Sequence, residues 1–134
     1  MKKRSQKKTK AIVLCSPNNP TGSVIPKSKL EAILKLAKKY DFWVISDEIY
    51  SELLYQPKYH SFAALSGAKK RTILMNGFSK AFSMTGWRLG YICAPEDLIE
   101  RALKIHQYAA LCASSLSQYA AIERSEEHTS ELQS

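Results

Sequence analysis

The sequence is poor in cysteine, and its few cysteines form no recognisable set. Cys15, Cys93 and Cys112 are odd in number and share no spacing typical of a metal site or a disulfide framework. We therefore expect no metal centre and a reducing, cytoplasmic environment. Long apolar runs are also lacking, so no segment reaches the length of a membrane helix. The apolar stretch 11–15 is too short for a secretory signal, which leaves the membrane and secreted classes excluded.

Acidic residues are the minority, with twelve against twenty basic ones and a formal net charge of +8. Six of the basic residues fall within the first ten positions, whereas residues 11–123 carry thirteen basic and nine acidic side chains, a net of +4. A nucleic-acid surface usually interleaves aromatic residues and continues on a folded face. We interpret residues 1–10 as a basic, disordered arm and expect no nucleic-acid partner. A basic nucleic-acid-binding module is the weaker alternative.

The last eleven residues, 124–134, differ abruptly in composition from the helical stretch before them. Their sequence, RSEEHTSELQS, resembles an in-frame translation of a common sequencing adapter. We expect this tail to be non-native and to make no packed contacts, because it lacks apolar periodicity. The segment 11–123 is then the part of the chain that carries fold and function, and the natural protein would continue beyond it.

Strand and helix patterns alternate along residues 11–123. Continuous apolar runs with β-branched or aromatic residues predict buried strands over 11–15, 42–46, 71–76 and 87–94. Apolar residues at helical spacing predict helices over 28–40, 96–108 and 116–123, the first with a capping box formed by Ser28 and Glu31. A strand, a helix and a strand with short joins predict a parallel pair, so the fold class is α/β.

Two polar motifs follow the first two predicted strands. Residues 16–22 read SPNNPTG, which by itself is typical of a turn. Residues 46–50 read SDEIY and place two carboxylates at the end of a buried strand. Asp47 suits either a helix cap or a charge-assisted contact to a protonated ligand nitrogen. Ligands of open α/β sheets bind at the carboxyl ends of strands, so we expect both motifs to meet at one site.

A third motif follows the third predicted strand and is the most specific of the three. Residues 76–91 read NGFSKAFSMTGWRLGY, with Lys80 in a loop that bears glycine and serine, and Arg88 eight residues later. A lysine amine can attack an aldehyde as a nucleophile. The planar guanidinium of Arg88 suits a phosphate. Taken singly, either residue would be read as an ordinary surface cation.

Together the three motifs resemble those of class I and II aminotransferases, the fold-type I pyridoxal-phosphate enzymes. The motifs occur in the family's order, and the resemblance covers residues 11–123. It implies an incomplete part of the large, pyridoxal-phosphate-binding domain, whose mostly parallel sheet is flanked by helices. The implied reaction is amino-group exchange between an amino acid and a 2-oxo acid. The complete parent is expected to be a homodimer, and the fragment is expected to be inactive alone.

The resemblance also implies a role for each candidate site residue. Lys80 would hold the cofactor covalently and act as the catalytic acid and base. Asp47 would keep the pyridine nitrogen protonated, Asn19 and Tyr50 would hydrogen-bond the 3′ oxygen, and Arg88 would bind the phosphate. A cis peptide bond before the proline that follows Asn19 is expected as well.

The chain departs from the family pattern at one place, because Gly77 stands where a hydroxyl residue often precedes the lysine. Ser79 is a candidate substitute for that hydroxyl. A pyridoxal-phosphate lyase that cleaves C–S bonds would share the same cofactor residues and is the alternative within the enzyme class. A non-catalytic binding or regulatory domain of the same fold is the alternative outside it.

Overall fold

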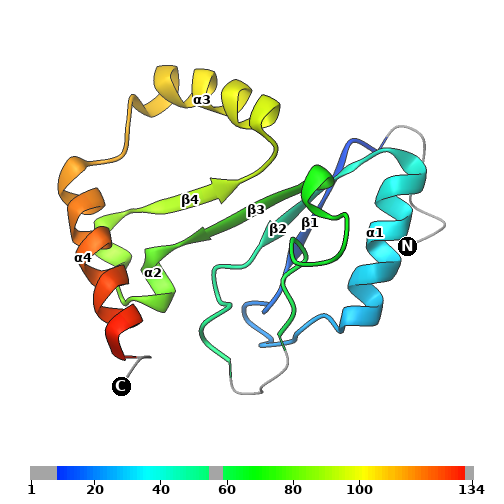
Figure 1. Ribbon diagram of the computed structural model, residues 1–134, viewed down its shortest axis with the longest axis horizontal. Coiled ribbons are helices and arrows are strands. Elements are labelled where there is room, and N and C mark those ends of the chain that lie inside the picture. The colour runs from blue at the N-terminus through cyan, green and yellow to red at the C-terminus, as the bar shows by residue number, and fades with distance from the viewer. Residues whose placement is uncertain (1–8, 55–58, 132–134) are drawn as a thin grey trace.

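A four-stranded sheet forms the centre of the computed structural model, which describes residues 9–54 and 59–131, with side chains up to residue 126. The strands β1 (Ala11–Cys15), β2 (Trp43–Asp47), β3 (Thr72–Gly77) and β4 (Gly90–Cys93) lie side by side in chain order (Figure 1). The first three run parallel, and β4 is antiparallel to β3. The predicted α/β class with a mostly parallel sheet is therefore confirmed.

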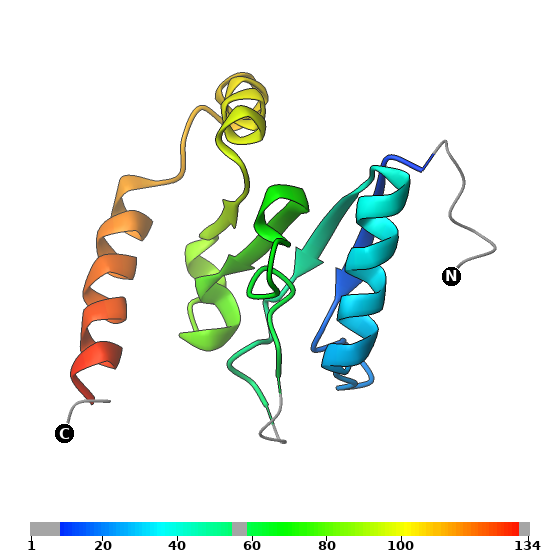
Figure 2. The ribbon, with the colours of Figure 1, turned by 45° about the vertical axis from the view of Figure 1, so that its right-hand side comes forward.

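Helix α1 (Lys27–Tyr40) connects β1 to β2 and supplies one side of the apolar core. Its buried residues recur every three or four positions, as the sequence predicts, so they share one face. The core joins this face to buried residues of the strands and of the segment before β3. Its members are Leu14, Leu30, Ile33, Leu34, Ala37, Phe42, Val44, Phe62, Leu65 and Ala68. In Figure 2, α1 stands beside β1 and β2.

The predicted capping box at the start of α1 is wrong. The helix begins at Lys27, its N-cap is Pro26, and no side chain caps it. The fixed φ of Pro26 already suits a helix start, and its carbonyl accepts hydrogen bonds from the N–H groups of Lys29 at 2.9 Å and Leu30 at 3.1 Å. Ser28 therefore lies inside the first turn rather than ahead of it.

The fourth strand is shorter than predicted, since residues 87–89 and residue 94 are not part of it. Thr85–Trp87 forms a 3₁₀ turn, and Arg88 follows with a φ of 53°. A positive φ interrupts extended backbone, so β4 begins only at Gly90. The second and third strands each begin and end one residue later than predicted.

Two helices, α3 (Glu96–Ala110) and α4 (Ser115–Glu131), lie on the β4 side of the sheet, away from α1 (Figures 1 and 2). α4 continues past the predicted end at residue 123, since no glycine or proline interrupts residues 115–131. Residues 1–8 of the expected arm and 132–134 of the expected tail lie outside the described residues. Within the described ranges, no helix is long and apolar enough to cross a membrane.

Candidate active site

The carboxyl edge of the parallel strands brings the three motifs to the same side of the sheet. In register, Asp47 at the end of β2 lies between Cys15 of β1 and Met75 of β3. The loop of residues 16–26, the turn that begins at Glu48 and the short helix α2 (Phe78–Ala81) all leave the sheet from here. The sheet thus positions Asn19, Tyr50 and Lys80 through the segments that carry them.

The loop after β1 is held in shape by its own hydrogen bonds. The N–H of Asn18 donates to Ser23 O at 3.0 Å, and the N–H of Gly22, at a φ of 66°, donates to Asn18 O at 2.7 Å. The bond between Asn19 and Pro20 is cis, as expected. A short loop closed in this way fixes the direction of the Asn19 side chain.

Tyr50, in the second motif, lies next to residues of both the first and the third motif. Asn19 Nδ2 donates a hydrogen bond to Tyr50 Oη at 2.9 Å. On the other side, Lys80 Nζ lies 5.8 Å from the centre of the Tyr50 ring. Lys80 belongs to the single turn of α2 rather than to the predicted loop, and its side chain is half-buried. An amide, a phenol and an amine that are far apart in sequence therefore share one surface.

Asp47 has a structural task in addition to its place at this edge. Its Oδ1 accepts a hydrogen bond from the N–H of Ile49 at 3.2 Å, which supports the turn after β2. The helix-cap interpretation of Asp47 is wrong, because this bond closes a turn and no helix begins directly after β2. The side chain is half-buried, so the carboxylate is also reachable by a ligand.

Arg88 lies at the same end of the sheet but is directed to its own turn. Its Nη1 donates to Thr85 O at 3.0 Å, and the side chain is exposed. Ser117 Oγ, on α4, donates to Trp87 O at 2.8 Å and so ties the turn to that helix. The structure gives no contact between Arg88 and Asp47 or Lys80 in the described part of the chain.

The glycine at position 77 is required by the pairing of β3 with β4. A Cβ on Gly77 would lie 2.9 Å from both Gly90 Cα and Leu89 O. Such distances are too short for backbone atoms that cannot move aside. A hydroxyl residue at position 77 would therefore require the backbone of β4 to shift. Ser79, the candidate substitute hydroxyl, lies in α2, and its carbonyl accepts a hydrogen bond from Thr85 Oγ1 at 3.0 Å.

Sequence reasoning gave no role to Glu48, the second carboxylate of the SDEIY motif. The structure buries it, and its Oε1 accepts hydrogen bonds from Ser46 and Ser61. The signal for it was present in the sequence, because a carboxylate at the end of a buried strand needs partners. Nearby, the pKa of Tyr59 is raised, first by burial and then by the Glu48 carboxylate. The Tyr59 hydroxyl is buried and makes no hydrogen bond of acceptable geometry.

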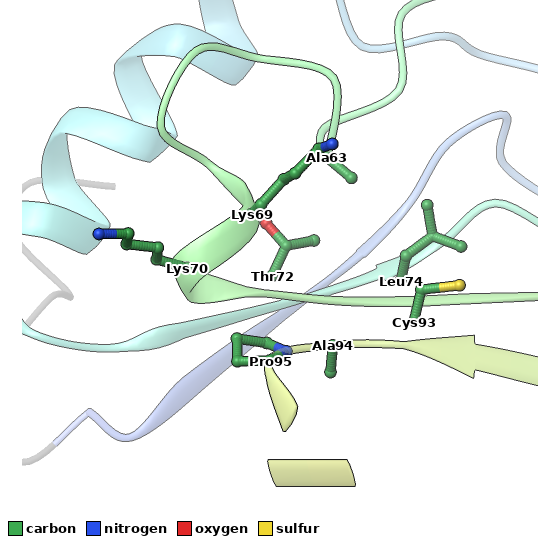
Figure 3. A pocket seen from close by; sticks show the side chains of 8 residues that line it. All are labelled: Ala63, Lys69, Lys70, Thr72, Leu74, Cys93, Ala94 and Pro95. Carbon is green, nitrogen blue, oxygen red and sulfur yellow. The ribbon is translucent and has the colours of Figure 1, made fainter. Parts of the chain in front are cut away.

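Two hollows mark opposite ends of the sheet. One, of about 570 Å³, is lined by residues 17–24 together with Tyr50, Leu53 and Leu54, and so adjoins the candidate site. The other, of about 410 Å³, lies where β3 begins and β4 ends, beside the 3₁₀ turn η1 (Lys69–Arg71) (Figure 3). Its lining includes Thr72, Leu74 and Cys93. Because β3 separates this second hollow from Lys80, it is no part of the candidate site.

Comparison with known proteins finds a large group of relatives. The family described as "Aminotransferase class I and II" matches residues 1–133. A putative aminotransferase, YugH, of Bacillus subtilis is 57% identical over 116 residues, which are 87% of this chain and 30% of that protein. An aspartate aminotransferase of Pyrococcus abyssi is 49% identical over 122 residues, 90% of this chain and 31% of that protein.

Solved structures agree with the sequence relatives. The aromatic aminotransferase of Pyrococcus horikoshii matches with a TM-score of 0.88 and 44% identity over 98% of this chain and 37% of that one. A mutant aspartate aminotransferase of Thermus thermophilus matches with a TM-score of 0.87 and 39% identity, over 95% of this chain and 33% of that one. The chain therefore spans about a third of the length of these proteins. By sequence and by fold, the chain belongs to the class I and II aminotransferase family.

Proposed function

We propose that the complete protein is a pyridoxal-phosphate-dependent aminotransferase and that this chain carries most of the groups that hold its cofactor. The observation that carries the proposal is the meeting of Asn19, Tyr50 and Lys80 at the edge where Asp47 ends β2. These donors fit the cofactor group by group. An amine suits its aldehyde, a carboxylate its ring nitrogen, and an amide with a phenol its ring oxygen.

In the proposed reaction each side chain has a defined task. When bound, pyridoxal phosphate supplies the electron sink that weakens the bonds to the substrate's α-carbon. Lys80 Nζ would hold the cofactor at its aldehyde carbon, with loss of water. Once displaced by the substrate's amine, the free Lys80 amine would carry the proton between the substrate's α-carbon and C4′ of the cofactor. Asp47 holds the proton on the ring nitrogen. Arg88 binds the phosphate once its side chain turns from Thr85 O, a contact on the protein surface that is easily exchanged.

The substrates that fit this proposal are an amino acid and a 2-oxo acid. Relatives named for aspartate and for aromatic amino acids support this class without choosing a member of it. We also propose a homodimeric parent and a cytoplasmic location. The location is supported by Cys15, Cys93 and Cys112, which are free thiols in the structure.

The test is chemical labelling of the complete parent protein. After loading with pyridoxal phosphate, borohydride reduction and peptide mapping are expected to find the cofactor on Lys80. A label on another lysine would refute the assignment. Supplying an amino acid with and without a 2-oxo acid then separates the reaction types, because an aminotransferase needs the acceptor for turnover whereas a C–S lyase releases its products without one.

A further inference from the structure

Glu48 is the one ionisable side chain that is fully buried among the residues with described side chains, with 3% of its surface exposed. Burying a carboxylate costs several kcal/mol unless hydrogen bonds or a cation compensate for the lost water. The hydrogen bonds described for the Glu48 side chain come from serine hydroxyls and a backbone N–H, and none comes from a basic side chain. Hydrogen bonds alone must therefore stabilise it.

Three donors from two separate segments converge on a single oxygen of Glu48. Ser46 Oγ of β2 and Ser61 Oγ donate to Oε1 at 2.9 and 3.0 Å. The N–H of Phe62 donates to the same atom at 3.1 Å. Hydrogen bonds to an ionised acceptor are stronger than neutral ones. The carboxylate therefore joins β2 to the segment that enters the core at Phe62, a side chain that is 1% exposed.

The backbone of Glu48 is fixed as firmly as its side chain. Its N–H donates to Met75 O of β3 at 2.9 Å, and its carbonyl accepts from the N–H of Ser51 at 2.9 Å. The turn that these bonds close contains Tyr50, whose carbonyl in turn accepts from the N–H of Leu53 at 3.0 Å. The position of the Tyr50 ring between Asn19 and Lys80 thus depends on the anchoring of this turn.

We propose that Glu48 is a positioning residue that sets the place of the Tyr50 hydroxyl at the cofactor's ring oxygen. The proposal rests on the proposed function. It adds to it a buried carboxylate that does not contact the cofactor itself but on which the geometry of the site depends. Glu48 lies two residues from Tyr50, and its own hydrogen bonds lead into the core rather than toward the candidate site. Its effect on the cofactor must therefore pass through the turn.

The test uses the complete parent protein loaded with pyridoxal phosphate, and it measures the pH midpoint of the absorption change of the bound cofactor. Tyr50→Phe removes a hydrogen bond that favours the ionised ring oxygen, so it should raise the midpoint. Glu48→Ala should raise it in the same direction, by at least about 0.5 pH unit. The double variant should shift the midpoint little further than Tyr50→Phe alone, because both changes remove the same interaction, the hydrogen bond from Tyr50 to the ring oxygen.

Two further variants keep the test informative if Glu48→Ala fails to fold. Ser61→Ala removes one donor and retains the carboxylate, so a smaller rise is expected. Glu48→Gln keeps an acceptor oxygen for all three donors and should remain near the wild-type midpoint. Glu52→Gln is the matched control, because Glu52 lies in the same turn with an exposed side chain, and its midpoint should not move.

Several outcomes would overturn the positioning role. Variants of Glu48 and Ser61 that lower the melting temperature but keep the wild-type midpoint would show a purely structural role. Additive shifts in the double variant would show that Glu48 acts by a route other than Tyr50. If Tyr50→Phe leaves the midpoint unchanged, the proposed contact of Tyr50 with the cofactor is wrong, and any shift from Glu48→Ala then contradicts the positioning role as well.

Discussion

At the scale of single residues, Lys80 carries the sharpest prediction. In the complete parent, Lys80→Ala should abolish the covalent link to pyridoxal phosphate but retain part of the affinity, because under the proposed function Asp47 and Arg88 would still hold the ring and the phosphate. Turnover should fall by at least about 100-fold, since the proposed function makes this one amine both the covalent anchor and the proton carrier. Equilibrium binding and steady-state rates measure the two effects.

Asp47→Asn is the matched comparison for Lys80→Ala. This variant should keep the borohydride-reducible link and lose turnover, because the ring nitrogen loses its charge partner. A Lys80→Ala variant that still yields a reduced, labelled lysine anywhere in the protein is the result that contradicts the assignment.

Gly77 provides a steric prediction of a different kind. Gly77→Ala should lower the free energy of unfolding by about 1–3 kcal/mol, because the new Cβ meets the backbone of β4 at 2.9 Å. Gly86→Ala is the control, since a Cβ there meets nothing within 4 Å. Its effect should stay within about 0.5 kcal/mol. Urea denaturation of the complete parent compares the two, and equal losses would show that the contact at Gly77 relaxes.

The candidate residues could be predicted from the sequence because each stands beside a strand end, where chemistry and topology agree. Tyr50 and Lys80 are in two of the three motifs, and their proximity follows from the parallel pairing of β2 and β3. The role of Glu48 could not be predicted, because its partners Ser61 and Phe62 come from a segment that carries no motif. The SDEIY motif indicates that a second carboxylate at the strand end needs hydrogen-bond donors, but not which residues supply them.

At the scale of elements, the packing of α1 on the sheet should dominate stability. Leu30→Ala removes a side chain that is 2% exposed in the core and should cost about 2–5 kcal/mol of unfolding free energy. Lys29→Ala, one position earlier and exposed, should change it by less than about 0.5 kcal/mol. Thermal and urea unfolding of the complete parent give both values, and comparable losses would contradict the described core.

α4 should influence phosphate binding through the turn that carries Arg88. Ser117→Ala removes the hydrogen bond to Trp87 O and should weaken binding of pyridoxal phosphate by about 3- to 10-fold, as expected for one hydrogen bond. Binding of pyridoxal, which lacks the phosphate, should change much less. Equal losses for both ligands would show that the bond supports the site in general rather than Arg88.

Element types were predictable where periodicity was strong, whereas the boundaries depended on local backbone contacts. The helical spacing of α1 gave its buried face correctly, but its start was decided by Pro26 and not by Ser28. The turn at Arg88 was missed because its flanking apolar residues read as continuous strand. The antiparallel direction of β4 follows from that tight return, which periodicity does not encode.

At the scale of the whole molecule, exposed apolar strands predict that the isolated chain associates. Val13 of β1 is 69% exposed, and Tyr91 and Ile92 of β4 are 47% and 41% exposed. Unpaired edges of this kind pair with other chains. Sedimentation of the purified 134-residue chain should show oligomers that Val13→Lys diminishes, together with no measurable transamination. A stable monomer with turnover comparable to that of complete enzymes would contradict both expectations.

The strand order in the sheet has a consequence for synthesis on the ribosome. Because β1, β2, β3 and β4 neighbour one another in chain order, each strand can add to the edge left by the one before it as the chain emerges. The turn with Tyr50 can therefore approach the loop of Asn19 before Lys80 has left the ribosome. In the nascent protein, the segments that carry Asn19 and Tyr50 would come together first, and Lys80 would join them later.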